Sequence, residues 1–172
     1  MMTDAELVRR SQKPAVIRPV TPQDTVALMA VLDATGLFPG SVLEELLKDH
    51  FAGRSGDGHH WLTYDDDGPV GVAYYAPERM TQGTWNVYLM AVHPNCQGGG
   101  RGAALLAHME RTLAARGGRV VLVETSGLDS FERTRAFYRK CGYHQEARIR
   151  EFYQAGEDKI VFWKKLAGAP KT

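Results

Sequence analysis

The chain of 172 residues has the length of one ordinary domain and can bury a sizeable hydrophobic core. Its 21 lysines and arginines nearly balance its 20 aspartates and glutamates, which argues against a nucleic-acid-binding surface and against a polybasic membrane surface. No apolar run approaches the roughly 20 residues of a membrane span, and the start of the chain is too polar for a signal peptide, so we expect a cytoplasmic protein.

The two ends of the chain are expected to lie outside the folded core. We predict a polar leader over residues 1–13, one domain over residues 14–167 and a short tail over residues 168–172. The cysteines and histidines show no four-ligand spacing typical of zinc, and we therefore expect no metal.

Two helices are predicted to follow a first strand. An alternating pattern predicts that strand over residues 15–20, and Thr21 before a proline is typical of a helix N-cap, with Gly36 as the helix stop. Ser41 and Glu44 have the spacing of a capping box, which predicts the start of a second helix.

Later apolar runs predict the rest of a sheet. An Asp-Gly turn joins strands over residues 60–64 and 70–76, and residues 87–92 form the next strand. A helix separates that strand from another over residues 119–125, so these two should lie parallel. The remaining predicted elements are a helix opened by a capping box of Asp129 and Glu132 and two strands over residues 143–153 and 159–166.

The order of these elements, β-α-α-β-β-β-α-β-α-β-β, defines the fold class. It predicts a single α/β domain with a mixed central sheet of about seven strands and helices on both faces.

The most informative stretch is the glycine-rich turn between the strand at 87–92 and the helix after it. The turn reads Gln-Gly-Gly-Gly-Arg-Gly over residues 97–102, and the helix has no acidic residue in its first turn. Glycines leave backbone N–H groups unshielded, and the positive end of the helix dipole disfavours the one charge there, Arg101, unless an anion binds. We predict an anion site that fits a phosphate.

Several kinds of glycine loop compete for this stretch. A Walker A loop is excluded because the Lys-Ser/Thr pair is missing. A dinucleotide-binding turn fits Gly98, Gly100 and Ala103, with Glu124 after the next strand, but it should turn directly off its strand, and five residues intervene here. An ordinary glycine turn before a helix is the simplest alternative.

The spacing of Gln97, Gly100 and Gly102 after an apolar strand that ends in Val-His-Pro resembles the acyl-CoA signature of the GNAT N-acetyltransferase superfamily. A second motif, Thr-Arg-Ala-Phe-Tyr-Arg-Lys-Cys-Gly-Tyr over residues 134–143, resembles the pattern after the second parallel strand in that family. The resemblance implies a GNAT-like domain that uses acetyl-CoA as the donor.

The resemblance also implies which residues bind the donor. The strand before the loop splays from its parallel neighbour in this family, its backbone pairs with the pantetheine arm, and a backbone amide there polarises the thioester carbonyl. The usual asparagine after the second parallel strand is absent, and Ser126 is the candidate replacement. The implied donor-binding residues are Met90, Ala91, Val92, Gln97, Gly98, Gly99, Gly100, Arg101, Gly102, Ala103, Ser126, Thr134 and Tyr138.

Two residues are candidates for the proton transfers of acetyl transfer to an amine. The second motif places Tyr138 where family members use a tyrosine as general acid, and a phenol suits a departing thiolate. Glu124, at the end of a strand that would line the cleft, is the first candidate for the general base, with Glu78 or a water chain as alternatives. The competing interpretations are a core aromatic for Tyr138 and an ion pair with a neighbouring arginine for Glu124.

We therefore expect an acetyl-CoA-dependent N-acetyltransferase that acts on a primary amine of a small molecule or peptide by direct attack. Neither nucleic acid nor membrane is an expected partner, and a homodimer is common for this fold. The alternatives are a non-catalytic CoA-binding or sensor module and a dinucleotide-binding oxidoreductase.

Overall fold

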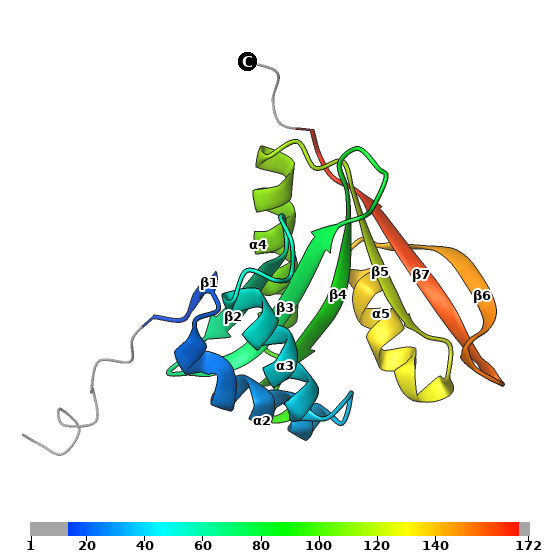
Figure 1. Ribbon diagram of the computed structural model, residues 1–172. Helices are drawn as coiled ribbons and strands as arrows, with labels where there is room; N and C mark the ends of the chain where they lie inside the picture. The colour runs from blue at the N-terminus through cyan, green and yellow to red at the C-terminus, as the bar shows by residue number, and fades with distance from the viewer. Residues whose placement is uncertain (1–13, 169–172) are drawn as a thin grey trace, which may run out of the picture.

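A seven-stranded sheet in the order β1-β2-β3-β4-β5-β7-β6 runs through residues 14–168, the part of the chain that the computed structural model describes (Figure 1). The predicted leader and the last four residues of the predicted tail lie outside this part. The strands are β1 (Val16–Pro19), β2 (His60–Asp65), β3 (Pro69–Pro77), β4 (Thr84–Val92), β5 (Val120–Ser126), β6 (His144–Gln154) and β7 (Glu157–Lys165).

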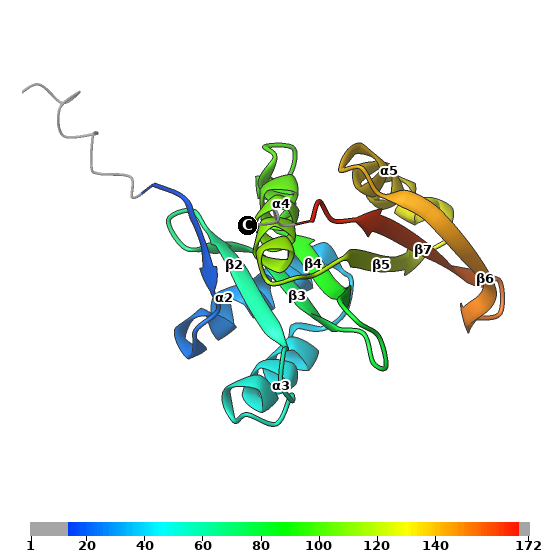
Figure 2. The ribbon, with the colours of Figure 1, turned by 90° about the horizontal axis from the view of Figure 1, so that it is seen from above.

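Helices cover both faces of the sheet, and short 3-10 turns precede three of them. The helices are α2 (Thr25–Thr35), α3 (Gly40–Phe51), α4 (Arg101–Ala115) and α5 (Glu132–Lys140), and the 3-10 turns are Pro22–Asp24, Pro94–Cys96 and Asp129–Phe131. Figure 2 shows α2 and α3 below the sheet and α4 and α5 above it. The predicted fold class and element order are therefore confirmed. None of the described helices is long and apolar enough to cross a membrane.

Each helical layer buries one apolar stripe. On α4 the stripe predicted by the 3.6-residue period, Leu105, Leu106, Met109 and Leu113, is at most 2% exposed and packs against the strands with α5. On the opposite face, α2 and α3 bury the leucines Leu28, Leu32, Leu43 and Leu47 against β3 and β4. The two clusters leave the centre of the sheet covered on both sides.

The strands β4 and β5 form the one parallel pair among the described strands, and they pair only over Thr84–Val87 and Val120–Val123. A β-bulge lies just beyond: Tyr75 is opposite Val87 while Tyr74 is opposite Leu89, which leaves Tyr88 as the extra residue of β4. After the bulge, β4 stays paired with β3 but separates from β5. A single parallel pair is incompatible with a doubly wound fold, which removes the structural basis of the dinucleotide-binding alternative.

Two predicted capping boxes are wrong. The helix α3 begins one residue before Ser41, because the Gly40 N–H donates to Asp33 Oδ1 at 2.7 Å and a Cβ on Gly40 would lie 2.8 Å from the Met29 carbonyl oxygen. Close approach to α2, and not a side-chain cap, therefore sets this start.

Before α5, Asp129 begins a 3-10 turn, and Glu132 does not reach back to a cap. Its carboxylate binds Arg135 at 2.8 Å and Arg139 at 2.8 Å. Ion pairs with arginines further along the same helix therefore override the capping spacing.

The predicted start at Thr21 is confirmed, and it is fixed by a buried carboxylate. Asp24 Oδ2 accepts from the Thr21 N–H at 2.8 Å and from the Thr21 hydroxyl at 3.0 Å. Arg18 binds Asp24 through both terminal nitrogens and also binds Asp65 at 2.8 Å, which joins β1 to β2. The hydrogen bonds from Arg18, followed by those from Thr21, lower the pKa of Asp24 from 3.8 to about 2.

This shift makes part of the stability depend on pH. Because the folded-state pKa of Asp24 is depressed, its contribution, about 2 kcal/mol, is present above about pH 5 and is lost as the pH falls towards about 2. We expect Asp24→Asn to lower the free energy of unfolding at pH 7 and to flatten its decline between pH 5 and pH 2, as measured by urea unfolding. Parallel declines in variant and wild type would contradict this account.

Candidate active site

The glycine loop and the N-terminus of α4 present a row of backbone amides. Ala104 is the first residue of α4 whose N–H has an intrahelical acceptor, the Gly100 carbonyl at 2.9 Å, so the amides of residues 101–103 precede the helical ladder. Gly98 and Gly100 have φ of 81° and 79°, and a Cβ on either would meet nothing within 4 Å. The loop is therefore open on its outer side, as an anion cradle requires.

Contacts with distant parts of the chain hold this loop in place. Gln97 Nε2 donates to the Val92 carbonyl at 3.0 Å, which ties the loop to the end of β4. Arg101 donates to Asp66 Oδ2 at 2.6 Å and to the Cys96 carbonyl at 3.1 Å. The sequence analysis missed Asp66 as a partner of Arg101, because 35 residues separate the two and only the tertiary fold brings the β2–β3 turn to the loop.

The two sequence motifs meet in space. A Cβ on Gly102 would lie 3.2 Å from the Phe137 ring and 3.8 Å from a methyl group of Val92. The glycine helix start, the end of β4 and α5 therefore converge, and a larger residue at position 102 would push against Phe137. Met90, Ala91 and Val92 pair with β3 but lie beyond the segment that pairs with β5, so their edge of β4 faces the gap.

Tyr138 lies in the core with its ring among aromatic neighbours. The residue is 6% exposed, and the rings of Phe137, Tyr143 and Phe162 lie 5.2 to 5.9 Å from its own, centroid to centroid. The Tyr138 hydroxyl has no hydrogen-bond partner within residues 14–168. Its oxygen is not fully enclosed, so it lies at an accessible edge of the core. Burial raises the pKa of Tyr138 well above 10, so the phenol stays protonated.

Ser126 and Thr134 flank the start of α5. The buried Ser126 hydroxyl accepts from the Leu128 N–H at 3.2 Å, and Thr134 is half-buried one turn before Tyr138. Arg135, 7% exposed, donates to the Ser126 carbonyl at 2.7 Å and to the Leu128 carbonyl at 2.8 Å. Sequence reasoning missed this arginine, because a charged residue in a polar helix gives no sign of burial.

Glu124 lies on β5 directly beyond the segment paired with β4. Its carboxylate pairs with Lys159 Nζ at 3.1 Å, so its ion pair is with a lysine of β7 and not with a neighbouring arginine. Lys159 is buried, and its Nζ lies 3.7 Å from the centroid of the Phe152 ring.

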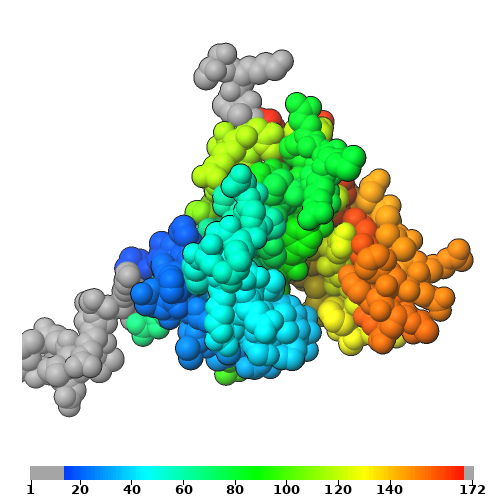
Figure 3. All heavy atoms as spheres, viewed as in Figure 1, coloured from blue at the N-terminus to red at the C-terminus, as the bar shows by residue number. Residues whose placement is uncertain are grey.

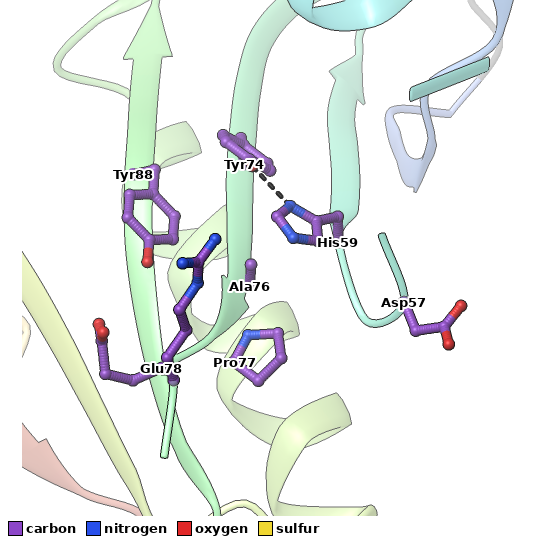
Figure 4. Close-up of a pocket in the computed structure, with 8 residues that line it drawn as sticks. Asp57, His59, Tyr74, Ala76, Pro77, Glu78 and Tyr88 are labelled. Atoms are coloured by element: carbon purple, nitrogen blue, oxygen red, sulfur yellow. Dashed lines mark hydrogen bonds between the residues drawn. The ribbon is translucent and has the colours of Figure 1, made fainter. Parts of the chain in front are cut away.

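A cavity of about 330 Å³ opens on the α3 side of β3 and β4 (Figure 4). Tyr74, which lines the cavity, stacks on the buried Trp61 at 4.2 Å between ring centroids, and its hydroxyl lies 2.6 Å from His59 Nδ1. The sequence analysis missed the cavity as a unit, since its residues come from three separate segments. The lining residues are Asp57, His59, Tyr74, Ala76, Pro77, Glu78, Arg79 and Tyr88.

The surface is hollowed between the half built from α2 and α3 and the half built from α5, β6 and β7 (Figure 3). This notch lies where β4 and β5 separate (Figure 1). Among the described residues no three His, Cys, Asp or Glu side chains gather in a way that would hold a metal ion.

Comparison with known proteins gives the family context of this geometry. A family profile described as "Acetyltransferase (GNAT) domain" matches residues 56–145. A GNAT-family structure from Desulfovibrio desulfuricans is 36% identical with a TM-score of 0.83, over 89% of this chain and 99% of that one. No curated protein sequence matched.

Two more distant structures share the fold. The ribosomal-protein-S18-alanine N-acetyltransferase from Escherichia coli is 20% identical, with a TM-score of 0.71 over 92% of this chain and 97% of that one. An aminoglycoside 6'-N-acetyltransferase solved with coenzyme A is 18% identical, with a TM-score of 0.72 over 91% of this chain and 99% of that one.

Proposed function

The chain belongs to the GNAT family and is an acetyltransferase, and we propose that it transfers the acetyl group of acetyl-CoA to a primary amine of a small molecule or peptide. The observation that carries this proposal is the separation of β4 from β5 directly beside the open glycine loop. That arrangement offers a slot for an extended thioester arm next to a row of amides for its diphosphate.

The donor side of the site fits acetyl-CoA in its chemistry. The amides of residues 98–103 suit the diphosphate. The edge of β4 at Met90, Ala91 and Val92 is not paired with β5, and apart from the Val92 carbonyl, which accepts from Gln97, it can hydrogen-bond to the amides of the pantetheine arm. Arg101 shares its charge with Asp66, so backbone dipoles carry most of the attraction for phosphate. The aminoglycoside 6'-N-acetyltransferase of the same fold, solved with coenzyme A, supports the same donor class.

We propose direct attack of the amine on the thioester, with Tyr138 protonating the departing sulfur. The raised pKa of Tyr138 keeps its proton available over the neutral range. Two carboxylates, Glu124 and Glu78, are candidates for taking the proton of the acceptor ammonium. The cavity lined by Tyr74, Glu78 and Tyr88 is the proposed acceptor site. A non-catalytic CoA-binding module is the alternative function.

We expect Gly99→Glu to weaken CoA binding more than tenfold in isothermal titration calorimetry, because a carboxylate would face the diphosphate across the open loop. Gly99 has ordinary backbone geometry, and its Cβ would meet only the movable end of Arg101 at 2.7 Å. Gly99→Gln, which adds the same bulk without charge, is the matched control and should lose much less affinity. Equal losses would mean that bulk and not charge is responsible.

We expect Tyr138→Phe to lower kcat by about 100-fold with CoA affinity changed less than twofold, since the variant keeps the ring packing and loses only the acid. The melting temperature should change little, because the hydroxyl has no partner within the described residues. The measurement is thiol release from acetyl-CoA with a panel of primary amines. Unchanged turnover would refute the acid role, and absence of turnover in the wild type would favour the non-catalytic alternative.

A further inference from the structure

Two carboxylates face the gap between β4 and β5 from opposite sides. Val87, Val121 and Val123 point into the core on the α4 side, so strand alternation puts Asn86 and Glu124 on the other face. The bulge puts Tyr88 on that face too, because Leu89 packs with the α2–α3 cluster and Tyr88 lines the cavity. Partial burial and then the negative charges of Glu78 and Glu124 raise the pKa of Tyr88, which is consistent with this arrangement.

Glu124 is poorly suited to accept a proton. Its carboxylate is the ion-pair partner of Lys159, an ammonium that is 8% exposed. Protonation of Glu124 would leave this buried positive charge without its counter-ion, which is costly in a protein interior.

Glu78 is free of this restriction. Its backbone N–H donates to the Thr84 carbonyl at 2.8 Å, which fixes the residue across the β3–β4 hairpin. Its side chain lines the cavity and accepts one neutral hydrogen bond, from Asn86 Nδ2 at 3.3 Å, and within residues 14–168 it takes part in no ion pair. Figure 4 shows its carboxylate pointing to the same side as the Tyr88 hydroxyl.

The Asn86 side chain holds the Glu78 carboxylate from β4. The residue is 3% exposed, and its Oδ1 is one of two fully enclosed side-chain polar atoms of the described chain with no hydrogen-bond partner. A carboxylate accepts only, so the amide must turn its Nδ2 towards Glu78 and its Oδ1 away. A buried acceptor left unpaired costs free energy, and the hydrogen bond to Glu78 is kept in spite of that cost, which is consistent with a role of Asn86 in positioning Glu78.

We propose that Glu78 binds the ammonium of the acceptor and is the general base, that Asn86 positions the Glu78 carboxylate, and that Glu124 is the counter-ion of Lys159. This inference rests on the proposed function. In the bound complex the acceptor nitrogen donates to the Glu78 carboxylate, directly or through one water, while Asn86 Nδ2 holds that carboxylate. The rings of Tyr74 and Tyr88, 5.6 Å apart between centroids, receive an aromatic or apolar stem beside the amine.

The proton transfers balance. Glu78 takes one proton from the ammonium, and the neutral nitrogen forms the C–N bond as the C–S bond breaks. Tyr138 gives its proton to the departing sulfur. The nitrogen then loses a second proton, which returns to Tyr138. The N-acetyl amine and the free thiol of CoA leave, and Glu78 returns its proton to solvent.

A binding experiment tests the ammonium site with 2-phenylethylamine as the probe. The probe is titrated into the CoA-loaded protein while the side-chain amide of Asn86 is followed by NMR. We expect a saturable shift of this amide in the wild type and at least tenfold weaker binding in Glu78→Gln. Affinity should stay within twofold of wild type in Asp57→Asn, which removes a carboxylate on the side of the cavity across from Glu78 (Figure 4). No saturation, no shift of Asn86, or equal affinity in Glu78→Gln would overturn the inference.

Turnover of the same probe tests the base. We expect Glu78→Gln to lower kcat/KM about 100-fold at pH 7. The deficit should narrow as the pH approaches roughly 10, because solution then supplies neutral amine. Glu78→Asp should recover part of the rate, and Glu124→Gln should melt at a lower temperature with the wild-type pH profile. The other ionisable side chains that line the cavity, Asp57, His59, Tyr74, Arg79 and Tyr88, are unchanged in these variants.

A pH-independent deficit in Glu78→Gln would indicate a merely structural role and overturn the base assignment. The base assignment would also be overturned if the wild type binds the probe but does not acetylate it. Thermal shift with acetyl-CoA is measured on the same samples. If acetyl-CoA does not shift the melting temperature of the wild type, the proposed function is wrong. If acetyl-CoA shifts it but the Glu78 variants behave like the wild type, only the assignment of Glu78 is wrong.

Discussion

The site depends on one constraint, the end of parallel pairing between β4 and β5 after four residues on each strand. The extra residue at Tyr88 bends β4 and leaves the segment from Met90 to Val92 paired on one side only. Backbone hydrogen-bonding groups on the free side need partners, and an extended ligand with its own amides can supply them. The same separation exposes Glu124 and opens the notch between the two halves of the domain (Figure 3). A sheet paired along its full length would have neither feature.

The glycine loop lies at the end of the gap between β4 and β5. Its amides remain available because side chains from elsewhere hold the loop at its edges: Gln97 bonds back to β4, Arg101 reaches the β2–β3 turn, and Gly102 packs on Phe137. The loop is thereby organised before an anion arrives, which lowers the reorganisation needed on binding. On the acceptor side, the Glu78 carboxylate is held by Asn86 and lies beside aromatic surfaces, so donor and acceptor meet at the bulge from opposite directions.

Local patterns in the sequence predicted the fold well, since periodicity and turn chemistry act over a few residues. The leucine stripe of α4, the Asp-Gly hairpin and the start at Thr21 are all confirmed. The predicted starts of α3 and α5 were wrong by one to three residues. At α3 the tertiary contact of Gly40 with α2 outweighed local capping, and at α5 Glu132 pairs with arginines of its own helix instead of capping it. The pairing of Arg101 with Asp66, the burial of Arg135 and the cavity at Tyr74 depend on residues far apart in the chain, so no local pattern could show them.

The central claim is that the row of amides at the start of α4 binds the diphosphate of acetyl-CoA while the free edge of β4 binds its arm. Amide hydrogen exchange followed by NMR, with acetyl-CoA and with NADH in parallel, tests this most directly. We predict that acetyl-CoA slows exchange at residues 98–103 and at residues 90–92, leaves α2 and α3 unchanged, and that NADH has no such effect. Protection elsewhere with the loop unaffected, or the same protection by NADH, would contradict the account.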